Sequence, residues 1–298
     1  MIRQTWAIAL SILAVGSIGQ SVAPAAEPAH FHHVRLNVRD PQKSIKFYSG
    51  YYGAVPTKYR GNPDALFVEK SFLLFNVVAS PPDGTLDTGI WHIGWGGVDV
   101  AHEYEWLKKH KLEIATPLSP LTGPDNYYFY ARGPDKELIE INTMGHHRFG
   151  HVHFFCTDVN ASTNWYVKHL GLKARLPNRP KPAGDMSTIA RIWLNVIQCD
   201  NVTMIFFGKP DIEPGPPWWR DPPLKDLKPT KGRPIDHIAF SYRQIEPVFE
   251  AMQKSGVKIV EPIKDDPKYH FKSFYVEGPD KVLIEIVEEK PVPEGIWE

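Results

Sequence analysis

The stretch that decides the fold is His237–Glu285, which reads HIAFSYRQIEPVFEAMQKSGVKIVEPIKDDPKYHFKSFYVEGPDKVLIE. A similar stretch, His92–Glu140, reads HIGWGGVDVAHEYEWLKKHKLEIATPLSPLTGPDNYYFYARGPDKELIE. In both, the first His and the last Glu are 48 positions apart, and a Tyr precedes the Glu by ten positions. Each stretch predicts a strand, a helix and three short strands, so the chain contains an internal repeat.

Two further units of the same kind begin at His33 and His151. In the first of them, Asp40-Pro41 supplies an N-cap and a proline at the first helical position, and Gly53 is placed to end the helix. Strands are expected around 55–59, 66–69 and 72–78. The sequence therefore predicts the α+β class with four βαβββ modules, the first pairing with the second and the third with the fourth.

Length and composition favour two ordinary domains. The chain has 298 residues, of which 42% are hydrophobic. Acidic and basic residues number 34 each without a basic run, so nucleic acid is not expected as a partner. We place the first domain at 26–147 and the second at 148–290, with a proline-rich insertion at 208–234. That insertion carries Trp218-Trp219 and is expected to be a surface excursion, either a lid or a loop held to the body by its tryptophans.

The N-terminus has the pattern of a secretory signal peptide over residues 1–25. Arg3 is the positive charge, Trp6–Ile18 is the apolar core, and Ala23-Pro24-Ala25 is the processing site. A membrane span needs about 20 apolar residues, so we expect no stable membrane anchor after processing, with a short uncleaved anchor as the alternative. The expected location is periplasmic or secreted. Cys156 and Cys199 could pair there or be two small core residues, and the sequence leaves this open.

Six residues that can bind a metal recur in register. Each His begins the first strand of a module, and each Glu lies on the last strand of an even-numbered module. A lone His at a strand start is more often a structural residue, but recurrence favours a ligand set. Two imidazoles and one carboxylate can hold Fe(II) or another divalent ion with open positions for substrate. With the expected pairing, the predicted trios are His33, His92 and Glu140 in the first half, and His151, His237 and Glu285 in the second.

Two neighbouring features refine these predicted sites. When the last strands of the odd-numbered modules are aligned to Leu-Ile-Glu-Ile, Phe75 and Phe206 take the place of the Glu. Neither binds a metal, so a three-ligand site with open positions is preferred. His153 shares a strand face with His151 and is either a local acid or base, or a supporting or exposed residue.

These motifs resemble the vicinal oxygen chelate superfamily, which includes glyoxalase I, bleomycin-resistance proteins, fosfomycin-resistance thiol transferases and extradiol dioxygenases. The resemblance covers about 31–288 and rests on the strand-start histidines, the Asp-Pro helix starts and the Gly-Pro-Asp-Lys turns that lead to each Glu. It implies that the paired modules form two open half-barrel domains. It also implies a divalent metal that chelates two adjacent substrate oxygens.

Within this superfamily, the extradiol dioxygenases resemble the chain better than glyoxalase I does. They use His, His and Glu with a Tyr ten positions before the Glu, which matches Tyr275 and Tyr130 and implies that these tyrosines are catalytic. A cavity-wall role is the alternative for both. The chain departs from the dioxygenase pattern because no His stands about fifteen positions before His237, and Lys281 replaces the usual Gly.

The sequence thus predicts an exported enzyme that uses a divalent metal on a small substrate with adjacent oxygens, with extradiol-like ring cleavage as one form of that chemistry. Fe(II) is the favoured metal, and Mn, Zn or Ni would also suit the ligands. A glyoxalase-like isomerase or lyase is one alternative, and a bleomycin-resistance-type sequestering protein is another. The second half is favoured as the active one because its insertion could cover the site. The substrate and the oligomeric state are left open.

Overall fold

The structure is a computed structural model, and it describes residues 27–121, 123–143, 148–180, 193–208, 227–266 and 271–289. The predicted signal peptide and most of the predicted insertion, including Trp218-Trp219, lie outside these residues. In the described part of the chain, no helix combines the length and the apolar character needed to cross a membrane.

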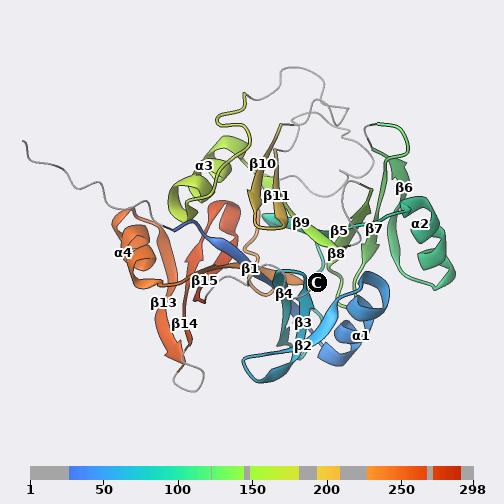
Figure 1. The fold of residues 1–298 in the computed structure, drawn as a ribbon, viewed down its shortest axis with the longest axis horizontal. Coiled ribbons are helices and arrows are strands. Elements are labelled where there is room, and N and C mark those ends of the chain that lie inside the picture. Colours follow the sequence, from blue (N-terminus) through green and yellow to red (C-terminus); the bar gives the residue numbers. More distant parts are fainter. Residues whose placement is uncertain are drawn as a thin grey trace, which may run out of the picture.

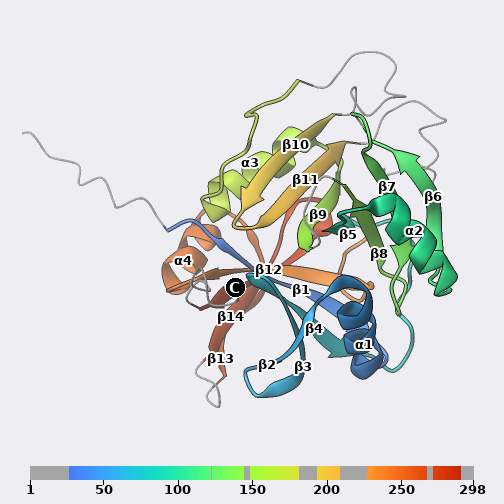
Figure 2. The same ribbon diagram turned by 45° about the vertical axis from the view of Figure 1, so that its right-hand side comes forward.

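The first sheet joins modules one and four. Its described strands follow the order β13-β14-β15-β12-β1-β4-β3-β2. In its middle β1 lies beside β4 (Figure 1) and beside β12 (Figure 2). Module one supplies β1 (His30–Val38), β2 (Val55–Tyr59), β3 (Asn62–Val68) and β4 (Ser71–Val77). Module four supplies β12 (Ile235–Tyr242), β13 (Lys258–Asp266), β14 (Phe271–Glu277) and β15 (Leu283–Glu288).

The second sheet joins modules two and three. Its described strands follow the order β10-β11-β9-β5-β8-β7-β6, with β9 beside β5 (Figure 2). Module two supplies β5 (Ile90–Gly96), β6 (Ile114–Pro120), β7 (Tyr127–Arg132) and β8 (Leu138–Asn142). Module three supplies β9 (Phe149–Cys156), β10 (Leu194–Cys199) and β11 (Val202–Gly208).

Each module places its helix after its first strand. The helices are α1 (Pro41–Tyr52), α2 (Val100–Lys109), α3 (Val159–Leu170) and α4 (Glu246–Lys254), and a 3-10 turn, η4 (Pro279–Lys281), precedes β15. The Asp40 carboxylate accepts hydrogen bonds from the first-turn backbone of α1, and Gly53 ends that helix in the left-handed region at φ 66°. The predicted helix between Asp40 and Gly53 is therefore confirmed.

The pairing of the modules differs from the prediction. β1 of module one runs antiparallel to β12 of module four, and β5 of module two runs antiparallel to β9 of module three. The prediction that module one pairs with two, and three with four, is therefore wrong. All four first strands carry the same alternation, which suits either pairing, so the choice of partner depends on contacts between distant parts of the chain.

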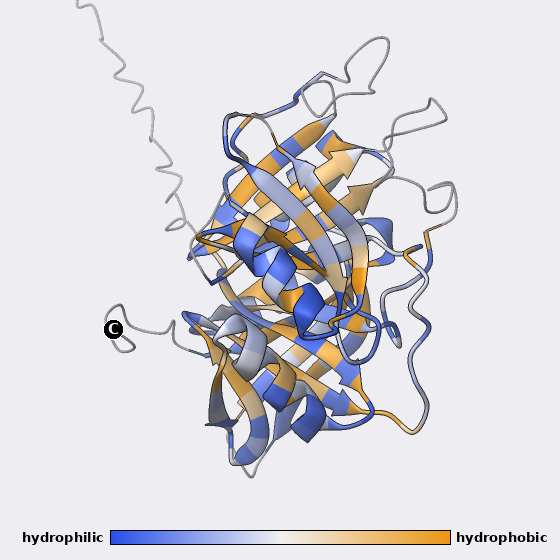
Figure 3. Cartoon of the chain, turned by 90° about the vertical axis from the view of Figure 1, so that its right-hand side faces the viewer, coloured by the Kyte–Doolittle hydropathy of each residue, from blue (hydrophilic) through white to orange (hydrophobic). Residues whose placement is uncertain are grey.

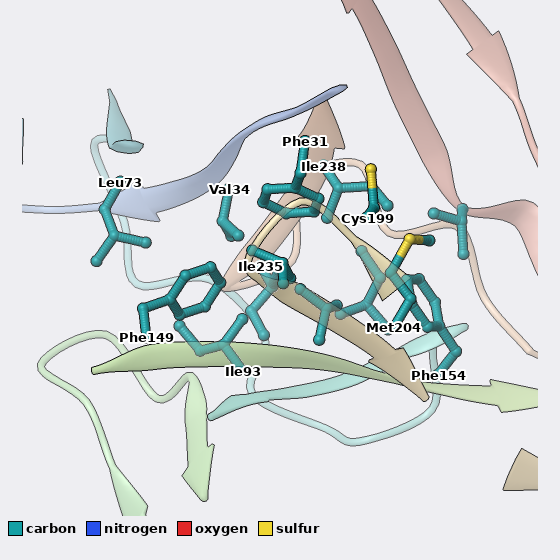
Figure 4. Packing of buried hydrophobic residues seen from close by; sticks show 14 of the residues in the cluster. Phe31, Val34, Leu73, Ile93, Phe149, Phe154, Cys199, Met204, Ile235 and Ile238 are labelled. Carbon is teal, nitrogen blue, oxygen red and sulfur yellow. The ribbon is translucent and has the colours of Figure 1, made fainter. Parts of the chain in front are cut away.

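The two sheets share one hydrophobic core. Side chains from β1, β5, β9 and β12 meet in it, among them Val34, Ile93, Phe149 and Ile238 (Figure 4). Hydrophobic and hydrophilic residues alternate along the strands (Figure 3), and alternate side chains point to opposite faces of a sheet. The strand-start histidines therefore lie on the faces directed away from this core. Each is the third or fourth residue of its strand, not the first as predicted.

Both cysteines lie on the core side of the second sheet. Cys156 and Cys199 are buried, and both thiols are free. The sequence left open whether they pair, and in the structure they are two small core residues.

Candidate metal centres

The first centre consists of His33, His237 and Glu285. These residues come from β1, β12 and β15, and all three side chains are buried. The Glu285 Oε2 atom lies 3.3 Å from His33 Nε2 and 3.2 Å from His237 Nε2. One ligand atom from each residue lies within 4.8 Å of the others, so the set could hold one cation.

In the first centre, the Nδ1 atom of each imidazole is linked to a carboxylate, directly in His237 and through His32 in His33. Asp236 Oδ1 lies 2.6 Å from His237 Nδ1. His33 Nδ1 lies 2.6 Å from His32 Nδ1, and His32 Nε2 lies 3.0 Å from Glu289 Oε2. Proton donation from His33 to His32 and from His32 to Glu289 leaves the lone pair of His33 on Nε2. Backing of this kind orients metal-binding histidines and sets their tautomer.

The donors of the first centre suit a divalent cation. His33 Nε2 is buried and makes no hydrogen bond in the structure, although a carboxylate oxygen lies near it. Burial lowers the pKa of His33 well below its usual value, which keeps the imidazole neutral as a metal ligand must be. Burial alone would raise the pKa of Glu285, but the hydrogen bond from His237 and the nearby imidazole of His33 hold it well below its usual range. The carboxylate is therefore ionised.

Tyr275 completes the surroundings of this carboxylate. It lies on β14 directly opposite Glu285 of β15, and its ring is 5.4 Å from the ring of His237. Burial, followed by the charge of Glu285, raises the pKa of Tyr275. The phenol is therefore protonated at neutral pH and can donate a hydrogen bond.

The second centre consists of His92, Glu140, His151 and His153. Its ligand atoms also lie within 4.8 Å of one another, and all four residues are buried. His92 Nε2 lies 3.1 Å from Glu140 Oε2, 3.3 Å from His151 Nε2 and 3.1 Å from His153 Nδ1. The second centre therefore offers four donors where the first offers three.

Glu140 is held by two neighbouring residues. Its Oε2 accepts a hydrogen bond of 2.9 Å from the Tyr130 hydroxyl, and its Oε1 accepts one of 2.5 Å from the Asn142 amide. Burial opposes ionisation, but the hydrogen bond and the charge of His92 hold the pKa of Glu140 far below its usual value. Burial lowers the pKa of His151 to about 4. The centre therefore combines an ionised carboxylate with a neutral imidazole.

Among the described residues, no carboxylate binds the outward-facing nitrogens of two imidazoles of the second centre. His92 Nδ1 and His153 Nε2 are buried without a hydrogen-bond partner among the described residues. Trp91 stands immediately before His92, where Asp236 stands before His237. The surroundings are aromatic and apolar instead, and comprise Trp91, Tyr128, Tyr130, Leu138, Phe155, Phe207 and Leu227.

Gly94 makes room for the imidazole of His151. It lies opposite His151 across the β5–β9 pair, and a Cβ added at Gly94 would lie 1.9 Å from His151 Cε1. At the matched place in the first centre, Ala239 lies opposite His33. The two rings therefore cannot lie in the same way over the opposing strand.

All six predicted ligands lie in the two centres, but the predicted trios are corrected. His33 joins His237 and Glu285, whereas His151 joins His92 and Glu140. The exchange follows from the pairing of the modules. The sequence interpretation missed the donor role of His153, for which the signal was its place two residues after His151, on the same strand face. It also missed Asp236 and His32, each of which immediately precedes a ligand.

The strands β4 and β11 of the odd-numbered modules correspond to β8 and β15, which carry the two Glu ligands. At the position of the Glu they carry Leu74 and Ile205. These two residues pair with Arg35 and His153, each two positions after a strand-start His. The predicted Phe75 and Phe206 lie one residue further on and point into the hydrophobic core, because a shift of one residue reverses the face of a strand. Leu74 and Ile205 cannot bind a metal either, so the expected lack of a ligand at this place is unchanged.

Comparisons with known proteins agree with this architecture. The family described as Glyoxalase/Bleomycin resistance protein/Dioxygenase superfamily matches residues 30–141 and 148–286. No curated protein matches the chain. Glyoxalase I from Zea mays is 19% identical with a TM-score of 0.65, over 87% of this chain and 92% of that one.

A second solved structure shares this fold. A Bacillus subtilis protein for which a dioxygenase activity has been proposed is 15% identical with a TM-score of 0.54, over 88% of this chain and 86% of that one. Identities this low show a shared fold alone. The family match, by contrast, spans both halves and most of the chain. The chain therefore belongs to the Glyoxalase/Bleomycin resistance protein/Dioxygenase superfamily, as a member with two tandem halves.

Proposed function

We propose that the protein is a divalent-metal-dependent enzyme that binds a small substrate through two adjacent oxygens at the first centre. The observation that carries this proposal is the buried His33 Nε2, which makes no hydrogen bond. It lies beside an ionised Glu285, and the neighbouring His237 is oriented by Asp236. Two imidazoles and one carboxylate leave coordination positions open for substrate and for dioxygen. Fe(II) is the metal we favour, and Mn, Zn or Ni would also suit these donors.

A metal at the first centre would act as a Lewis acid that stabilises an enolate- or catecholate-like substrate anion. The residues of the chain supply the rest. Asp236 and the His32–Glu289 pair orient the two imidazoles. Tyr275, protonated and opposite Glu285, is placed to donate a hydrogen bond to a substrate oxygen. Tyr130 holds the matching position at the second centre.

Ring cleavage of a catechol-like substrate is the reaction we favour, because three donors leave more open positions than four. A glyoxalase-like isomerisation or lyase reaction is the second candidate. The four donors of the second centre favour it, because a more filled coordination sphere suits a non-redox metal. A protein that only sequesters its ligand would have no use for either metal centre.

The test combines metal loading with ligand binding under anaerobic conditions. Protein loaded with Fe(II) is expected to bind catechol and, once dioxygen is admitted, to consume it as the ring opens, whereas protein loaded with Zn binds catechol without consuming dioxygen. Turnover with Zn or Ni in the absence of dioxygen would favour the isomerase. Undiminished binding of catechol by metal-free protein would favour sequestration.

A Tyr275→Phe variant separates catalysis from metal binding. It should retain the metal and lose on the order of 100-fold in turnover if the phenol assists proton transfer. The matched Tyr130→Phe variant should leave turnover unchanged if the first centre carries the reaction. Equal losses in the two variants would assign the chemistry to both centres.

Export is a separate part of the proposal. It rests on the charged and apolar segments at the N-terminus, with the A-x-A pattern at Ala23-Pro24-Ala25. We expect the mature chain in the periplasm or outside the cell, without a lasting membrane anchor. Fractionation of the producing cells, with N-terminal sequencing of the recovered protein, tests this. A full-length chain in the cytoplasm would contradict it.

A further inference from the structure

Arg35 occupies a special place beside the first centre. It stands two positions after His33 on β1, so both side chains lie on the same face of the sheet. Across its two neighbouring strands it pairs with the ligand His237 and with Leu74. Its charge acts on both His33 and Tyr275, which places the guanidinium near the donors.

This guanidinium has no partner among the described residues. No described carboxylate lies within ion-pair distance of Arg35, and its Nε atom is buried without a hydrogen bond. By contrast, Arg233, which also packs against the first sheet, is paired with Asp83 and Asp87. A buried donor on a charged group is costly to leave unpaired. An anion that arrives with the substrate would supply the missing partner.

The matched position of the second centre serves a different purpose. His153 also stands two positions after its strand-start His, and its Nδ1 lies 3.1 Å from His92 Nε2. The fourth donor of the second centre is therefore replaced at the first centre by a cation. This exchange keeps the first centre at three protein donors and adds a group that binds anions.

We propose that Arg35 binds a carboxylate, or a comparable oxyanion, that the substrate carries beside its two chelating oxygens. The planar guanidinium can make two parallel hydrogen bonds to a carboxylate, which fixes the orientation of the bound molecule as well as its charge. The substrate class is therefore an acid with adjacent oxygens, such as a carboxylated catechol. This inference rests on the proposed metal chemistry at the first centre.

The test compares probes that differ by one carboxylate. Catechol, 2,3-dihydroxybenzoate and 3,4-dihydroxybenzoate are titrated calorimetrically into anaerobic protein loaded with Mn or Zn. We expect at least one of the two acids to bind at least tenfold more tightly than catechol. In Arg35→Gln this preference should disappear while the affinity for catechol is retained, and Arg35→Lys should keep part of it. Arg243→Gln, at an exposed surface position, is the control and should behave as the wild type.

The outcomes separate this inference from the function on which it rests. Binding of catechol and both acids with equal affinity by the wild type would overturn the role of Arg35 and leave the metal chemistry standing. An unchanged preference in Arg35→Gln would do the same. If the metal-loaded protein binds none of the three probes, both proposals fall. Metal content, measured in every variant, confirms that the first centre is intact.

Discussion

The two centres are built on equivalent strands of the two sheets and differ in what surrounds the ligands. At the first centre, carboxylates back both imidazoles and Arg35 stands beside three donors. At the second, His153 adds a fourth donor and the distal nitrogens of His92 and His153 have no described partner. The ligands alone would make the two centres equivalent. Their neighbours are what make them unequal.

The largest expected effect comes from removing one ligand of each centre in turn. His237→Ala should abolish metal binding at the first centre, and His92→Ala should abolish it at the second. Elemental analysis of the purified variants should then fall from two metal ions per chain to one in each case. Full occupancy in His237→Ala would remove the first centre from the comparison.

Asp236→Asn tests the backing of His237. Loss of such a carboxylate typically weakens metal affinity by about 10–100-fold, and we expect this at the first centre alone. Competition with a chelator measures the two affinities separately. Asp265→Asn, at an exposed position of the same sheet, is the control. Equal weakening of both centres would indicate a general loss of structure.

The fourth donor of the second centre is tested by His153→Ala. We expect weaker metal binding there, by roughly tenfold, with the first centre unaffected. In the cobalt-substituted protein, the variant should also change the visible absorption of the second centre, since the coordination number changes. An unaltered spectrum would show that His153 is a neighbour and not a ligand.

A prediction about stability, which leaves both metal centres unchanged, concerns the Gly-Pro-Asp-Lys turns, which Glu137 follows in module two and Val282 in module four. Burial raises the pKa of Glu137 to about 7, although Tyr48 donates a 2.6 Å hydrogen bond to it. The folded state therefore holds a proton that the unfolded state releases near pH 4.5. The free energy of unfolding is therefore highest below pH 4.5, and the titration of Glu137 lowers it by about 3 kcal/mol as the pH rises to 7.

Chemical denaturation between pH 4 and pH 8 measures this effect. In Glu137→Gln the decline should be absent, whereas the exposed control Glu113→Gln should follow the wild type. Parallel curves for wild type and Glu137→Gln would show that the carboxyl does not titrate in this range.

The local pattern was sufficient to find the modules and the six residues that gather in the two candidate centres. The two ends of the helix at Asp40-Pro41 and Gly53 could be predicted, because helix capping depends on residues that are close in the chain. The pairing of the modules could not be predicted in this way, since Val34 and Ile238 alternate with histidines just as Ile93 and Val152 do. The prediction that Phe75 takes the position of the Glu was wrong for a related reason. The register of a strand is set by its partner strand, and an error of one residue places the side chain on the opposite face.

The exchange of modules has a consequence for how the chain could have diverged. His33 comes from one half of the sequence and His237 with Glu285 from the other, so neither half alone contains a complete first centre. The protein is equivalent to a heterodimer whose two subunits have been fused, with both binding sites at the contact surface. In a homodimer, a substitution such as His to Arg would appear in both sites at once. Fusion frees each site to change alone, which is how Arg35 and His153 come to occupy matched positions in one molecule.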